Sequence, residues 1–91
     1  MIVTLEKTKE WLRVESSDED VLIAGLIAAA EDIVSGILRF PLSEFEDVPE
    51  TVRQAIYYAV SVMYEQRESL DIVALMESLR GMLFAYRKAA W

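Results

Sequence analysis

The chain has 91 residues, 54% of them hydrophobic and 27% charged, and nine basic against sixteen acidic residues give a net charge of −7. This length predicts a single domain over residues 1–91 with one modest core, and the composition excludes a disordered chain. The excess of acidic residues disfavours a function that depends on binding nucleic acid or anionic membranes through clustered Lys and Arg.

The sequence contains neither cysteine nor histidine. Their absence excludes disulfides, Cys-His and Ser-His nucleophile pairs, and nearly all common zinc, copper and haem sites. The remaining acids, such as Glu31 beside Asp32 and Glu44 near Glu46, show no sign of converging across a cleft. We therefore predict no enzyme, no cofactor and no metal site, and a hydrolase that uses carboxylates alone is the weakest alternative.

A membrane span is not expected. The uncharged run from Val21 to Ala30 stops at Glu31 and Asp32, whereas a transmembrane helix needs about 18–20 consecutive apolar residues. The N-terminal stretch MIVTLEKTKEW carries acids and lysines where an export signal would have an apolar core, so no signal peptide is expected either.

The first two predicted helices are separated by an acidic linker, ESSDED. The first helix begins after Thr4, a good N-cap, and ends near Val14. Ser17 followed by Asp20 approximates a capping box, which predicts a second helix from about Asp18 to Leu38. A calcium site is the alternative for these acids, but the turn glycine and the distal glutamate of an EF-hand loop are missing.

The second helix is apolar on two neighbouring stripes, whereas an ordinary amphipathic helix has one. A helix of this kind is buried on two sides, either in the centre of its domain or between its domain and a neighbour. One stripe holds Leu22, Leu26, Ala29, Ile33 and Ile37, and the other holds Ile23, Ile27, Ala30, Val34 and Leu38.

Residues 39–48 break the helical pattern and predict a loop. Phe40 precedes a proline, which favours extended backbone. We expect Phe40 and Phe45 to pin this loop to the core, and an exposed binding loop is the alternative.

Two more helices are expected after the loop. One begins near Pro49 and runs to about Glu68, and the other begins at Ser69 or Asp71 and continues toward the C-terminus. Tyr57 and Tyr64 flank the third helix, where a tyrosine usually packs at the boundary of the core, although an interface role is a second interpretation. The helical period throughout predicts an all-α fold, a small bundle of about four helices.

The order of these pieces resembles a family, the head-tail connector proteins of long-tailed bacteriophages and prophages, also called adaptor or DNA-packaging connector proteins. The resemblance runs through the stretches TLEKTKEWLRVESSDEDVLIAGLIAAAEDIV, PETVRQAIYYAVSVMYEQRE and SLRGMLFAYRK. The sequence departs from the family pattern before its last helix, where IVALMESL stands in place of a proline and a glycine.

The resemblance implies a structural role in the virion. Subunits of such a protein would form a ring of dodecameric symmetry in the virion, beneath the portal protein, and link the DNA-filled head to a stopper or tail-completion protein. DNA would only pass through as cargo, assembly would take place in the host cytoplasm, and no membrane is involved. A non-viral helical dimerisation or adaptor module is the alternative, because two stripes also suit a two-fold helical interface.

Candidate site residues follow from this interpretation and from the stripes. Eight are expected at the oligomer interface: Leu22, Ile23, Leu26, Ile27, Ala30, Val34, Tyr57 and Tyr64. Four C-terminal residues are expected to dock to the portal or tail: Phe84, Tyr86, Arg87 and Trp91.

Overall fold

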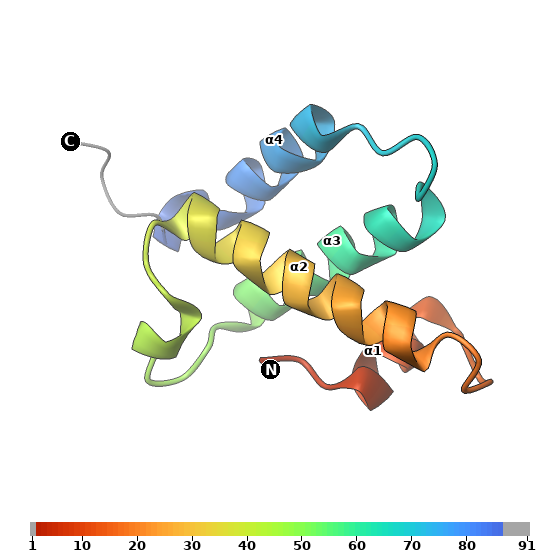
Figure 1. Cartoon of the computed structure of the whole chain (residues 1–91). Helices are drawn as coiled ribbons and strands as arrows, with labels where there is room; N and C mark the ends of the chain where they lie inside the picture. The colour runs from red at the N-terminus through yellow and green to blue at the C-terminus, as the bar shows by residue number, and fades with distance from the viewer. Residues whose placement is uncertain (1, 87–91) are drawn as a thin grey trace.

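The structure, a computed structural model, describes residues 2–86, and this part of the chain contains helices and no β-strand. The predicted all-α bundle of about four helices is therefore confirmed (Figure 1). In chain order the elements are α1 (Leu5–Leu12), α2 (Asp20–Leu38), the 3₁₀ turn η1 (Leu42–Glu44), α3 (Glu50–Glu65), α4 (Ile72–Leu83) and the 3₁₀ turn η2 (Phe84–Tyr86).

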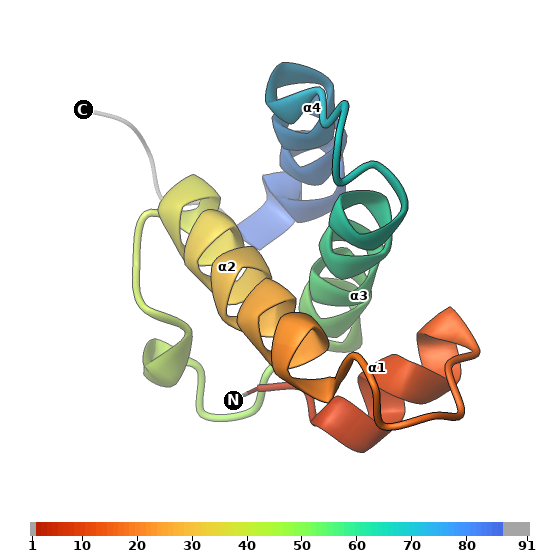
Figure 2. The ribbon, with the colours of Figure 1, turned by 45° about the vertical axis from the view of Figure 1, so that its right-hand side comes forward.

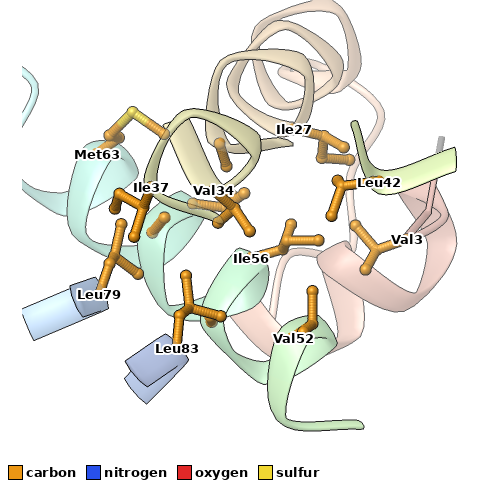
Figure 3. Packing of buried hydrophobic residues seen from close by; sticks show 14 of the residues in the cluster. Val3, Ile27, Val34, Ile37, Leu42, Val52, Ile56, Met63, Leu79 and Leu83 are labelled. Carbon is orange, nitrogen blue, oxygen red and sulfur yellow. The ribbon is translucent and has the colours of Figure 1, made fainter. Parts of the chain in front are cut away.

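The three longest helices, α2, α3 and α4, each contact the other two, and α1 packs against both α2 and α3 (Figures 1 and 2). Apolar side chains from all three long helices meet between them, and Val3 and Leu42 extend this core toward the N-terminus and the loop (Figure 3). The buried residues of α4 are Leu75, Leu79 and Leu83, which repeat at the spacing of one helical face. Each helix is thus held mainly by its apolar face.

Two of the predicted helix starts are confirmed by their caps. The Thr4 hydroxyl accepts a hydrogen bond from the Lys7 N–H at 3.1 Å, and the Asp71 carboxylate accepts one from the Ala74 N–H at 3.0 Å. These bonds satisfy donors that a helix leaves free in its first turn.

The predicted capping box of the second helix is wrong. α2 begins at Asp20 with Glu19 as its N-cap residue, and no side chain caps it. Ser17 contributes its backbone carbonyl, which accepts a hydrogen bond from the Asp20 N–H at 3.2 Å in the turn that precedes the helix. The Glu19 side chain is turned instead toward the end of α3, where it binds other residues.

The loop after α2 is pinned as expected. Phe40 and Phe45 make an edge-to-face contact with ring centroids 5.1 Å apart, and Phe45 makes a second one with Tyr86 at 6.4 Å. Both phenylalanines are partly buried against the core. The loop is therefore tied to the end of the described chain as well as to the bundle.

Helices three and four are shorter than the sequence suggested. α3 ends at Glu65 and not near Glu68, and α4 gives way at Phe84 to the short turn η2. Residues 66–71 connect α3 to α4.

By length and composition alone, α2 could cross a membrane, since it has 19 residues and a mean hydropathy of 2.0. The core helix of a soluble protein and a signal sequence meet the same criterion. α2 also contributes six buried residues to the core. The absence of a membrane span thus stays a prediction.

Candidate functional site

The two apolar stripes of α2 differ sharply in burial. One stripe lies inside the subunit with no exposed surface, and Ile37 beside it is 4% exposed. The fully buried stripe consists of Ile23, Ile27, Ala30, Val34 and Leu38. Four of the predicted interface residues, Ile23, Ile27, Ala30 and Val34, therefore pack in the core of the chain itself and present no surface to a neighbour in this conformation.

The other stripe is only partly covered. Leu22, Leu26, Ala29 and Ile33 lie at the boundary between core and solvent. Val21 next to them is 90% exposed, the largest exposed fraction among the large hydrophobic residues described. An apolar helix face left open in this way is typical of a protein–protein contact.

The outward side of α2 also carries small residues. Gly25 and Ala28 share this side with Val21, because residues spaced by three or four lie on one helix face. A Cβ built on Gly25 or on Gly36 meets no atom within 4 Å, so neither glycine is required by the packing of the subunit. The backbone of α2 is consequently accessible to a neighbouring element.

Three polar contacts hold the beginning of α2 in place. Lys9 of α1 forms an ion pair with Asp20 at 2.7 Å. Glu19 accepts a hydrogen bond from the Tyr64 hydroxyl, and its other carboxylate oxygen lies 3.3 Å from the Arg67 guanidinium. The Arg67 guanidinium also lies 5.3 Å from the centroid of the Tyr64 ring. The outward face of α2 is therefore presented by a helix that is fixed at this end to both α1 and α3.

This cluster changes the acidity of the tyrosine. The hydrogen bond to Glu19 raises the pKa of Tyr64 above its usual value of 10.0, and desolvation and the negative charge of Glu19 act in the same direction. The positive charge of Arg67 opposes them. Tyr64 stays protonated and able to donate through neutral and mildly alkaline pH.

The middle of α2 is tied to the N-terminal segment. The Glu31 carboxylate accepts hydrogen bonds from the backbone N–H groups of Ile2 at 2.8 Å and Val3 at 3.3 Å. The neighbouring Asp32 is exposed. One acid of this pair thus serves the fold, and the other faces solvent on the outward side of the helix.

Both tyrosines predicted at the interface have partners within the chain. Tyr57 stacks on Trp11, with ring centroids 5.2 Å apart and planes 11° apart, and Tyr64 binds Glu19. Trp11 remains 45% exposed. The interpretation that these tyrosines pack at the boundary of the core accounts for their contacts. Both side chains keep some exposed surface.

The C-terminal candidates fall into two groups. Phe84 is 79% exposed, whereas Tyr86 is partly buried beside Phe45. Arg87 and Trp91 lie outside the described residues.

A surface depression lies against α1. Its volume is about 540 Å³, and its lining comes from α1 and the residues just after it: Glu6, Lys9, Glu10, Arg13, Val14 and Glu15. Lys9 is engaged by Asp20, and among residues 2–86 no group of three or more potential ligand side chains gathers to hold a metal ion.

Some of these anchoring roles escaped the sequence analysis. Neither the contacts of Glu31 nor those of Glu19 were predicted, and each carboxylate binds groups distant in the chain. For Glu31 a signal was present, since an acid in the middle of an otherwise apolar helix needs a polar partner when it is partly buried.

A small helical bundle that satisfies its own core and leaves an apolar helix face open is typical of a structural subunit in a larger assembly. Residues 2–88 match the family model described as Phage gp6-like head-tail connector protein, and the chain belongs to this family. It is thus a phage structural connector of the head-tail junction. Neither the search of curated proteins nor the search of solved structures found a significant match.

Proposed function

We propose that this protein assembles into a ring beneath the portal and joins the DNA-filled head to a stopper or tail-completion protein. The observation that supports the ring is the exposed apolar face of α2, above all Val21 at 90% exposure. The core of the subunit is already buried without a partner. Covering this face with a second copy removes apolar area from water, which is the main driving force of association.

The interface in this proposal is narrower than the sequence suggested. Leu22 and Leu26 remain candidates because they are partly exposed beside Val21. Ile23, Ile27, Ala30 and Val34 act indirectly, since they hold α2 in the bundle and so set the position of its outward face. Tyr64 acts in the same way through Glu19.

The proposal also includes a contact between the C-terminal segment and the portal or tail. Phe84 and Tyr86 belong to this segment within the described residues, and Arg87 and Trp91 follow them in the sequence. The acidic charge of the chain suits a channel component, because a surface with a net charge of −7 lets DNA pass without holding it.

Light scattering over a wide concentration range tests the ring. We expect a species of about a dozen subunits, on its own or when the portal protein is added. A closed dimer at every concentration, with no larger species on the portal, would contradict the ring and favour the dimerisation module.

The variant Val21→Asp supplies the matched test, since it places a charge on the open face without touching the core. It should keep the helical circular dichroism of the wild type and lose the large species. Glu68→Ala, at an exposed position in the turn after α3, should change neither property.

A further inference from the structure

The outward faces of α2 and α4 carry complementary rows of residues. On α2 the row runs from apolar positions around Ala28 to an acid, Asp32, and it ends with a base, Arg39, the residue just after the helix. On α4 it contains Glu77, Arg80 and finally Phe84, which is 79% exposed. Ala28 and Asp32 are four residues apart, and Glu77, Arg80 and Phe84 are spaced by three and four, which places each set on one side of its helix.

The charged members of both rows are unused within the subunit. Within residues 2–86, neither Asp32 nor Arg39 forms an ion pair. The same holds for Glu77 and Arg80, although they are three residues apart on α4. Four exposed charges in a fixed order are thus free to pair with another molecule.

We propose that the outward face of α2 in one subunit binds the outward face of α4 in the next copy of this chain, with the two helices antiparallel. This inference rests on the proposed ring and names two surfaces that would form part of it. It assigns Phe84 to the contact between subunits and not to the portal or tail, and Val21 lies outside the stretch of α2 that α4 covers.

The antiparallel direction brings an apolar contact and an opposite-charge pair together in one register. With Phe84 seated on Ala28, both Arg80 and Asp32 lie four residues further along, about 6 Å at a rise of 1.5 Å per residue, and so face each other. Glu77 then lies opposite Ser35, four residues or about 6 Å before Arg39. A parallel arrangement that seats Val73 on Ala28 would set Glu77 against Asp32, and like charges in contact oppose binding.

The geometry of the bundle makes this contact heterologous. Because α2, α3 and α4 each touch the other two around a common core, the outward sides of α2 and α4 point in different directions (Figure 2). A contact between two different faces of identical subunits leaves a free face at each end, so repetition builds a ring where the rotation between subunits closes and an open filament where it does not.

Cysteine cross-linking tests the contact directly, because the chain has no native cysteine. Ala28→Cys and Phe84→Cys are made as separate variants and then mixed and oxidised under conditions in which the wild type assembles. We expect the mixed cross-link to dominate over both self cross-links. Ser78→Cys, exposed on α4 but on a different side from Phe84, replaces Phe84→Cys as the matched control and should cross-link little with Ala28→Cys.

Charge reversal gives an independent readout. Asp32→Arg and Arg80→Asp should each weaken assembly on the order of tenfold or more, because each brings like charges together. The double variant should recover assembly.

The outcomes separate the two proposals. Large species without a preferred mixed cross-link, or without recovery in the double variant, would overturn the α2 to α4 contact and leave the ring in place. A wild type that forms no species larger than a dimer, with or without the portal, would overturn the ring and this contact with it.

Discussion

The hydroxyl of Tyr64 at the end of α3 donates a hydrogen bond to the carboxylate of Glu19 at the start of α2, across 45 positions of the sequence. Arg67 lies 3.3 Å from the same carboxylate. Through this contact the end of one core helix holds the beginning of another, and the face that α2 presents to solvent depends on it.

Removing the tyrosine hydroxyl should therefore weaken the subunit. Tyr64→Phe keeps the ring and loses the hydrogen bond, so we expect a lower midpoint of thermal unfolding at neutral pH. Because the pKa of Tyr64 is raised in the folded state, its contribution to stability is complete below the unfolded value of 10.0 and is lost as the pH rises through the folded value. Unfolding curves at neutral and alkaline pH should show the wild type approaching the variant above pH 10, and a constant gap would contradict this account.

Replacing the acid within α2 should release the N-terminal segment. Glu31→Ala removes the acceptor for the N–H groups of Ile2 and Val3, and we expect a loss of about 1–2 kcal/mol in the free energy of unfolding. Denaturant titration measures this loss, and hydrogen exchange should show faster exchange at Val3. Glu68→Ala, an exposed acid with no such role, should lie within about 0.5 kcal/mol of the wild type.

Substitutions at two neighbouring positions on α2 should affect different properties, the stability of the subunit at Ile27 and assembly at Leu26. Ile27 is fully buried, so Ile27→Ala should reduce the stability of the subunit by about 2–5 kcal/mol, and Ile27→Asp should unfold it. Leu26→Ala, in the partly exposed stripe, should lower the stability of the subunit less than Ile27→Ala does and should weaken assembly more. Circular dichroism measures the first effect and light scattering the second, and equal behaviour of the two variants would contradict the division of the stripes.

Two arginines with a left-handed backbone conformation should each be replaceable by glycine with a gain in stability. Arg13 (φ 60°) and Arg39 (φ 68°) follow the ends of α1 and α2 in the left-handed region, which glycine adopts without strain. We expect Arg13→Gly and Arg39→Gly each to add about 0.5–1 kcal/mol to the free energy of unfolding, net of the lost attraction to the helix dipole.

Assembly should distinguish these two glycine variants. Arg39 belongs to the outward row of α2, whereas Arg13 lies after α1. Light scattering should show weaker assembly for Arg39→Gly alone, and equal assembly of both would argue against a role of Arg39 between subunits.

The sequence alone determined the helical class, the places of the helices and the pinned loop. These properties depend on local rules: the 3.6-residue period of apolar residues, Thr4 and Asp71 as caps, and the proline that follows Phe40. It also carried the resemblance to head-tail connectors, because that resemblance consists of the order and spacing of short stretches, and the family match over residues 2–88 confirmed it.

Only the tertiary structure decided which stripe of α2 is core and which is surface. The two stripes are nearly equal in hydrophobicity, so no local rule ranks them, and the choice follows from where α3 and α4 pack. The same holds for Glu19 and Glu31, whose partners lie 45 and 29 positions away. The place of Glu31 within an apolar helix indicates that it needs a polar partner, but packing alone decides which groups these two carboxylates bind.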